Sequence, residues 1–292
     1  MFERVISFDS LPSDWDLVRV AVDWAGNPLL LMAEGGGRRP EPPINPEAWS
    51  RWLQTSPTAL HVVYLEGNSV RTTRIAEGIG RLTMHVQPYD SGWVLGYGRG
   101  GRANVYGTDG ELLRTMKIGD AVEDLQTLSD GRIWVSYFDE GVYGSGISTQ
   151  GLVCFDRAGK AIFKFREYAD KPKLPPIDDC YAMNVTGHGD VWVNYYMAFP
   201  LVLLREMEAS QHWLEFGSMG NAFAVRGDHV IYLRDSKLMT RRLEPMSEPE
   251  NMDAVDASGN RLSPCATRYL SGAARGSSLV LNTGTAIYVA AP

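Results

Sequence analysis

The sequence has few of the features that mark secreted, membrane or metal-binding proteins. Its 292 residues include only three cysteines and five histidines, and neither residue type shows the spacing of metal ligands. Three cysteines cannot all form disulfides, which favours a reducing compartment. No apolar run approaches the length of a membrane span, and the N-terminal residues lack the basic segment and apolar core of a secretory signal. We therefore expect a cytoplasmic protein.

The sequence also has fewer basic than acidic residues. The 28 lysines and arginines are outnumbered by 35 aspartates and glutamates, which leaves a formal net charge of -7 at pH 7. Nucleic-acid phosphates and anionic membranes do not attract a net acidic surface, so neither is an expected partner. We expect a monomer whose partner is a small molecule or another protein.

Catalytic signatures are weak. Ser145 and Ser148 lack the context of a nucleophile elbow, and the glycine-rich residues 96–101 do not open a helix as a phosphate-binding loop does. The histidines are dispersed along the chain. An enzyme with this sequence would therefore use carboxylates or a metal ion.

What the sequence does have is a repeat. Six times, a short glycine-containing turn is followed at once by an apolar strand. Repeats of about 40–50 residues of this kind are typical of β-propeller blades. We predict an all-β, six-bladed β-propeller that occupies residues 1–292 as a single domain, with Trp93, Trp134 and Trp192 packed between blades. The six turns lie at residues 23–26, 90–92, 129–131, 187–190, 226–228 and 275–277.

The two chain ends are expected to close the ring. The last blade has only three strand-like segments, at residues 267–270, 278–282 and 286–290. Residues 3–8 alternate apolar and polar side chains and can supply the missing strand, which removes an exposed sheet edge. Residues 34–59 are too rich in glycine and proline for a hidden blade, and we interpret them as an insertion that contains a short helix near residues 45–54.

The long connections all fall on one face of the predicted ring. In a propeller, the loops between second and third strands and the loops between blades emerge on the same side. Residues 34–59, 139–149 and 166–179 belong to these two kinds of loop. Extended loops on one face of a rigid scaffold usually carry the binding site. We therefore place the candidate site at the channel mouth on this face.

Two groups of carboxylates are candidates for that site. Asp139 and Glu140 lie beside aromatic residues on a glycine-hinged segment, and Asp16, Asp124 and Asp179 stand near the starts of three inner strands. Acids gathered at a channel mouth need a cation, a basic ligand group or arginines to compensate them. They could hold a divalent cation or a polar ligand, or they could form a self-neutralised structural network, and the sequence leaves both readings open.

Aromatic and basic side chains complete the predicted site. The segment that carries Tyr196 and Phe199 follows a strand that ends at the same face, and a tryptophan, Trp49 or Trp52, would arrive on the inserted helix. The predicted ligand-binding residues are Asp139, Glu140, Tyr143, Asp178, Asp179, Tyr181, Tyr196, Phe199, Arg99, Arg102 and Trp49.

Two stretches of the sequence resemble a group of uncharacterised bacterial propeller proteins. The first is the run of residues 130–144 together with residues 151–156, and the second is residues 177–185 leading into residues 191–196. The blade pattern is also similar, at a distance, to NHL-type propellers and to streptogramin lyase. The lyase resemblance would imply a metal ion and histidines near the channel, and no histidines here occupy matching places.

Three functions follow from these observations. The first is a binding propeller that takes a ligand or a protein partner on the long-loop face. The second is a lyase or hydrolase in which Asp139 or Glu140 acts as a base or metal ligand on that face. The third is an interaction scaffold that uses a flat surface around Trp49 and Trp52.

Overall fold

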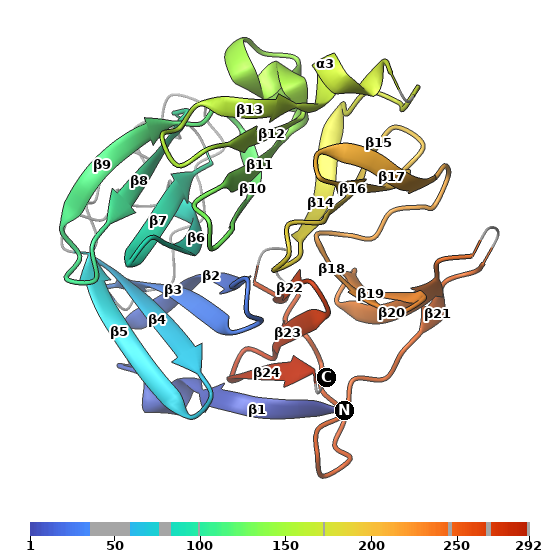
Figure 1. Ribbon diagram of the computed structural model, residues 1–292. Helices are drawn as coiled ribbons and strands as arrows, with labels where there is room; N and C mark the ends of the chain where they lie inside the picture. Colours follow the sequence, from blue (N-terminus) through green and yellow to red (C-terminus); the bar gives the residue numbers. More distant parts are fainter. Residues whose placement is uncertain are drawn as a thin grey trace, which may run out of the picture.

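The computed structural model describes residues 1–35, 59–75, 83–98, 100–171, 173–244, 247–266 and 270–290. These residues form six four-stranded antiparallel sheets arranged as the blades of a ring (Figure 1). The predicted all-β, six-bladed propeller is therefore confirmed. In each of the first five blades, the innermost strand comes first in the chain and the outermost comes last.

The first three blades follow the predicted order. Blade 1 contains β2 (Trp15–Val22), β3 (Pro28–Glu34), β4 (Leu60–Glu66) and β5 (Ser69–Ile75). Blade 2 contains β6 (Thr83–Tyr89), β7 (Gly92–Tyr97), β8 (Arg102–Tyr106) and β9 (Leu112–Lys117). Blade 3 contains β10 (Val122–Thr127), β11 (Ile133–Tyr137), β12 (Leu152–Phe155) and β13 (Ala161–Lys164).

The other three blades include one with a short outer strand. Blade 4 contains β14 (Asp179–Val185), β15 (Val191–Tyr196), β16 (Leu201–Arg205) and β17 (Glu208–Trp213). Blade 5 contains β18 (Ala222–Arg226), β19 (His229–Arg234), β20 (Lys237–Arg242) and the two-residue β21 (Glu250–Asn251). Blade 6 contains β22 (Gly272–Arg275), β23 (Ser278–Asn282), β24 (Ala286–Ala290) and β1 (Phe2–Ser7).

The N-terminal strand closes the ring as predicted. β1 pairs antiparallel with β24, from Phe2 opposite Ala290 to Ser7 opposite Ala286. The backbone N–H of Phe2 also donates to the carbonyl of Val255 at 2.8 Å. The connection between blades 5 and 6 therefore covers part of the outer strand of blade 6.

One of the six repeat turns shares its hydrogen-bond pattern with two other turns of the chain. In the first turn, Oδ1 of Asp23 accepts hydrogen bonds from two backbone N–H groups at 2.8 Å each. Gly26 has φ +92°, a left-handed conformation in which glycine meets no steric penalty from a Cβ. Asp156 and Asp256 bind two backbone N–H groups in the same way in turns farther along the chain. An aspartate followed by glycine thus specifies each of these reversals locally.

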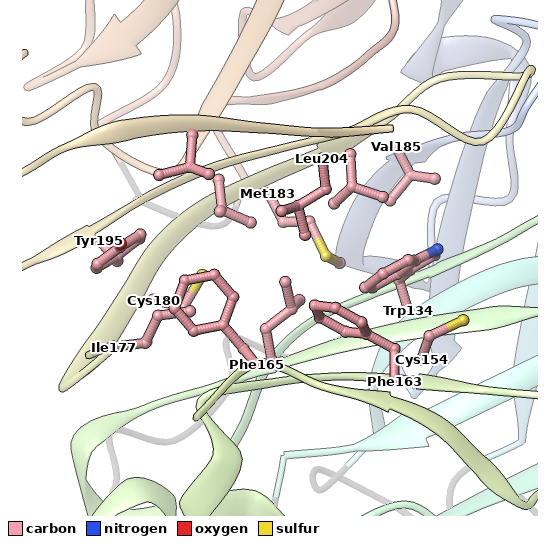
Figure 2. Packing of buried hydrophobic residues seen from close by; sticks show 14 of the residues in the cluster. Trp134, Cys154, Phe163, Phe165, Ile177, Cys180, Met183, Val185, Tyr195 and Leu204 are labelled. Carbon is pink, nitrogen blue, oxygen red and sulfur yellow. The ribbon is translucent and has the colours of Figure 1, made fainter. Parts of the chain in front are cut away.

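The hydrophobic core lies between neighbouring blades. Trp93, Trp134 and Trp192 are 8%, 1% and 7% exposed, as expected for residues packed between blades. Figure 2 shows the cluster between blades 3 and 4, where the Trp134 ring lies 5.3 Å from the ring of Phe163. Full burial of one large apolar side chain contributes roughly 1.5–3 kcal/mol. Contacts of this kind fix the angle between adjacent blades.

Two predicted loops contain short helices. The segment 139–149 contains α2 (Asp139–Val142) and most of the 3-10 helix η3 (Gly146–Gln150), and α3 (Phe165–Ala169) begins the connection to blade 4. A further 3-10 helix, η1 (Phe8–Ser10), follows β1. The helix predicted near residues 45–54, and with it Trp49 and Trp52, lies outside the described residues, as does Arg99. Within the described ranges, no helix is both long and apolar enough to cross a membrane.

Candidate functional site at the channel mouth

The inner strands of blades 1–4 share an irregularity near their starts. In each strand the pairing with its neighbour shifts by one residue, which is the pattern of a β-bulge. A bulge changes the direction in which the following side chain points, and bulges often occur beside binding sites. The residues that follow the four bulges are Arg19, His85, Asp124 and Ala182.

Three of these residues form a polar cluster in the central channel. Nη2 of Arg19 lies 3.5 Å from Oδ1 of Asp124, and Nδ1 of His85 lies 3.8 Å from the same oxygen. They line a small cavity of about 30 Å³, which we call the channel cavity. His85 is 2% exposed, and its burial, reinforced by the charge of Arg19, lowers its pKa well below 6.5. The imidazole is therefore neutral at pH 7.

Arg275 crosses the channel near the opposite face. It belongs to blade 6, but its Nε donates to the carbonyl of Val185 in blade 4 at 2.8 Å. Its Nη1 donates to Oε1 of Gln87 in blade 2 at 2.8 Å, and its Nη2 donates to the carbonyl of Thr127 in blade 3. Burial lowers the pKa of the guanidinium to about 10, so the group stays charged at pH 7.

A larger cavity lies on the long-loop face beside the channel. Its volume is about 380 Å³, and it lies among the starts of the inner strands of blades 4–6 and the turn between β19 and β20. We call it the mouth cavity. Asn221 lines both the mouth cavity and the channel cavity, so the two spaces adjoin. The residues that line the mouth cavity are Tyr181, Ser218, Gly220, Asn221, Leu233, Arg234, Asp235, Ser236, Ala266 and Ser271.

Charged and polar groups of the mouth cavity are held by a tight turn. Asp235 and Ser236 have φ +51° and +59°, the left-handed conformation that a two-residue turn of type I′ requires at both positions. Asn-Gly and Asp-Gly are the favoured sequences for such a turn. Arg234, which precedes the turn, lies with its guanidinium 5.9 Å from the ring of Tyr232. The oppositely charged residues Arg234 and Asp235 are therefore adjacent in the cavity wall.

Buried Asn194 fixes the position of the segment that contributes Ser218 to the cavity wall. Its Nδ2 lies 3.0–3.2 Å from three backbone carbonyls, those of Phe199, Pro200 and Gly217. Its Oδ1 accepts a hydrogen bond from the backbone N–H of Met219 at 3.1 Å. This one amide therefore ties the loop after β15 to the connection that carries Ser218 into blade 5.

Three predicted aromatic residues come together on this face. The rings of Tyr181 and Phe199 are 5.2 Å apart, and those of Phe199 and Tyr196 are 5.7 Å apart, both in edge-on arrangements. Tyr196 is 45% exposed. Tyr181 is the predicted site residue that also lines the mouth cavity. The other two rings extend from it across blade 4.

The predicted acidic segment of blade 3 adjoins this aromatic group. A hydrogen bond with Asp178 raises the pKa of the exposed Tyr143, and the charges of Asp139 and Arg166 act on the same hydroxyl. The backbone N–H of Asp178 donates to the carbonyl of Tyr196 at 3.1 Å, which connects the two groups. Tyr143, Asp139 and Asp178 thus lie together near the aromatic residues, but they do not line the mouth cavity.

The remaining predicted residues have other positions. Glu140 is exposed in the first turn of α2, and Asp179 begins β14 opposite Tyr196. The guanidinium of Arg102 lies 5.2 Å from the ring of Tyr97 in blade 2 and is not part of the mouth cavity. Trp49 and Arg99, as noted, lie outside the described residues. In the part of the chain that the structure describes, no three His, Cys, Asp or Glu side chains are grouped to hold a metal ion.

Sequence reasoning missed the residues that stand deepest in the channel. Asp124 was singled out, but its partners Arg19 and His85 were not. Arg275 was noted only as part of a turn. In blade 5, the turn at Asp235 and Ser236 contains no glycine. A polar turn without glycine at left-handed positions is a signal of a functional role that the sequence offered.

Comparison with known proteins gives the same fold. A model of the YxzG family matches residues 152–290. No curated protein sequence matches the chain. A solved structure of streptogramin B lyase is similar, with 9% identity, 99% of this chain and 96% of that chain covered, and a TM-score of 0.54.

Two further solved structures are similar to the chain. One is a catalytically inactive virginiamycin B lyase from Staphylococcus aureus with quinupristin, at 10% identity, 99% and 98% coverage of the two chains and a TM-score of 0.53. The other is a chain of a mitotic checkpoint complex, at 8% identity, 96% and 76% coverage and a TM-score of 0.51. At these identities, the likeness shows a shared propeller fold and nothing about activity. The predicted resemblance to the streptogramin lyase propeller is therefore confirmed for the fold.

Proposed function

We propose that this propeller binds a small polar ligand in the mouth cavity and that the ligand enters from the long-loop face. The observation that carries the proposal is the cavity itself, whose volume of about 380 Å³ is sufficient for a small molecule. Its lining combines an aromatic ring with charged groups and amide or hydroxyl groups. Such a mixture suits a ligand that has both hydrogen-bond donors and acceptors.

The charge of the lining favours a ligand that is polar rather than strongly ionic. Arg234 and Asp235 carry opposite charges on adjacent residues, and Asn221, Ser218 and Ser271 add neutral donors and acceptors. A ligand with one large charge would meet a group of like sign as well as one of opposite sign. A neutral or zwitterionic ligand can use both groups.

The position of Arg275 supports entry from one side. Its three hydrogen bonds reach the inner strands of blades 2, 3 and 4 at the short-turn end of the channel. A ligand that approached from that end would have to displace this side chain. The mouth cavity, by contrast, lies on the face that carries the connections between blades.

The predicted site residues outside the cavity would act as its rim. Tyr196 and Phe199 continue the aromatic surface from Tyr181, and Tyr143 with Asp178 extends it toward blade 3. A larger ligand or a peptide segment could contact this rim. Catalysis at Asp139 or Glu140 would require the reacting atoms to lie on the rim instead of in the cavity, and no observation favours that arrangement.

A screen by thermal shift tests the proposal. Wild-type protein, Arg234→Gln and Asp235→Asn would be melted with a panel of sugars, amino acids, nucleosides and metal ions. A ligand at 100 times its Kd stabilises the folded state by about 2.7 kcal/mol, which raises the melting temperature by roughly 5–10 °C. We expect at least one compound to do so for wild type and to lose at least half of the shift in both variants.

Arg102→Gln is the matched control. Arg102 is also an arginine beside a tyrosine ring on the long-loop face, but it lies outside the mouth cavity. The shift should be unchanged in this variant. Hits that stabilise Arg234→Gln and Asp235→Asn as well as wild type would place the binding site elsewhere and contradict the proposal.

A further inference from the structure

The channel cavity contains two acceptors that face each other. Nε2 of His85 lies 3.4 Å from the carbonyl oxygen of Val122, so Nε2 carries the proton and donates to it. Nδ1 then has a lone pair, and it is buried without a hydrogen-bond partner among the residues that the structure describes. Oδ1 of Asp124 is 3.8 Å away, which is too far for a direct hydrogen bond. Oδ1 already accepts a hydrogen bond from the backbone N–H of Leu125 at 2.9 Å, so Nδ1 of His85 is the acceptor that a donor in this cavity would satisfy.

From this geometry we infer that the channel cavity takes up a hydroxyl group of the ligand, so that the ligand is a neutral polyol or saccharide with a terminal hydroxymethyl group. The inference rests on the proposed binding function and specifies its ligand class. A hydroxyl group donates one hydrogen bond and also accepts, which suits a cavity lined by His85, Asp124 and the guanidinium of Arg19.

The charges around the cavity argue against the other common donors and acceptors. An ammonium group would enter a cavity whose one lining carboxylate, that of Asp124, is already paired with the guanidinium group of Arg19. A carboxylate group has no proton to offer to Nδ1 of His85 or to Oδ1 of Asp124. A neutral hydroxyl group meets neither difficulty.

The small volume of the channel cavity and its contact with the mouth cavity favour the same ligand class. A volume of about 30 Å³ is close to the volume of one water molecule, so it admits a hydroxyl group but not a ring. The rest of the ligand would remain in the adjoining mouth cavity, next to Asn221. There it meets the ring of Tyr181 and the paired donors and acceptors of Arg234 and Asp235. Flat polar side chains beside an aromatic ring suit the alternating hydroxyl groups and apolar faces of a sugar.

The test compares two sugars that differ in one hydroxyl group. D-Glucose and 6-deoxy-D-glucose would be titrated into wild-type protein, with binding followed by calorimetry and by ligand-observed NMR. Loss of the terminal hydroxyl leaves Nδ1 of His85 without its donor, so we expect wild type to bind the deoxy sugar about tenfold more weakly. D-Glucitol should bind, whereas glycine betaine and acetate should not.

Two variants locate the effect. In His85→Phe the unpaired acceptor is absent, and in Asp124→Asn the carboxylate charge beside it is lost. Both should reduce the preference for D-glucose to less than about threefold. Circular dichroism would show which variants fold. One folded variant is sufficient to show whether the preference for D-glucose depends on this cavity.

Several outcomes would overturn the inference. The first is equal affinity of wild type for the two sugars. The second is a folded variant that prefers D-glucose as strongly as wild type does. The third is a structure at high sugar concentration with only an ordered water between His85 and Asp124. Failure of all neutral polyols to bind would also overturn it. If charged compounds then bound in a way that depended on Arg234, the proposed function would stand while the assignment of the ligand class would fall.

Discussion

Replacing Arg275 by methionine would remove the hydrogen bonds that join blade 6 to three other blades across the channel. The carbonyl groups of Val185 and Thr127 and the Oε1 of Gln87 would each lose a donor. A buried acceptor left without a donor costs about 1–3 kcal/mol, so the three together cost roughly 3–9 kcal/mol. Methionine preserves most of the volume of the arginine stem, so the loss of packing is small.

One effect opposes this loss. Burial lowers the pKa of the Arg275 guanidinium from 12.5 to about 10, which corresponds to roughly 3 kcal/mol of unfavourable burial of its charge. The substitution relieves that cost. The net destabilisation is therefore about 0–6 kcal/mol, and its midpoint of about 3 kcal/mol is a large part of the 5–15 kcal/mol that stabilises a typical domain.

Urea denaturation followed by tryptophan fluorescence would measure the difference. We expect Arg275→Met to lower the free energy of unfolding by about 3 kcal/mol and the melting temperature by roughly 6–10 °C. Arg261→Met is the control, because the ion pair of Arg261 with Asp253 is exposed and its loss should change stability by less than about 0.5 kcal/mol. A gain in stability for Arg275→Met would refute the reasoning, since it would mean that the three acceptors lose their donor at less cost than the relieved burial of charge.

Three other predictions concern the channel and the cavity walls. Because the pKa of buried His85 is lowered in the folded state, the unfolded chain binds more protons below pH 6.5, and stability should fall by up to about 1.4 kcal/mol per pH unit as the pH decreases. Urea midpoints from pH 7 to pH 5 should show a shallower fall in His85→Phe, and an equal fall would contradict the assignment. A Cβ at Gly220 would lie 2.0 Å from a backbone oxygen, so Gly220→Ala should lower the free energy of unfolding by about 2–4 kcal/mol. Gly259 has a similar positive φ but open space around it, and thermal melts of Gly259→Ala should show a loss of only about 1 kcal/mol; equal losses at the two sites would argue against the close contact. Replacing Asp235 and Ser236 together by Asn-Gly should stabilise the turn by roughly 1 kcal/mol in thermal melts while weakening ligand binding, and a destabilised double variant would show that the native side chains serve the fold.

Much of the fold could be predicted because its signals are local. The reversal at Asp23 and Gly26 depends on hydrogen bonds within five residues, and the same pattern recurs at Asp156 and Asp256. The tryptophans were assigned to the core because they recur at one position of the repeat. The strand that closes the ring was recognised from alternation and from the strand missing at the other end. The short helices at Asp139 and Phe165 were not predicted, because a helix of one turn leaves almost no periodic pattern.

The candidate site was predictable only in part. The choice of face led to Tyr181, Phe199 and Tyr196, which do lie together, because strand alternation and chain direction determine which end of a blade a residue occupies. The residues that line the mouth cavity from blades 5 and 6 had no distinguishing motif. Polar residues at a turn, such as Arg234 and Asp235, are common on any protein surface, so their type alone did not indicate a cavity.

By itself, then, the amino-acid sequence determined most of the strands, the turns, the number of blades and the strand that closes the ring, but the first strand of blade 6 lies at Gly272–Arg275 and not at the predicted residues 267–270. Those features depend on side-chain alternation and on hydrogen bonds between residues close in the chain. Only the tertiary structure decided which polar side chains meet in the channel. Arg275 and Gln87 are 188 residues apart, and they touch because closing the ring brings the inner strands of non-adjacent blades within reach of one long side chain. The bulges that precede Arg19, His85 and Asp124 depend in turn on pairing between strands, which no local pattern of residues specifies.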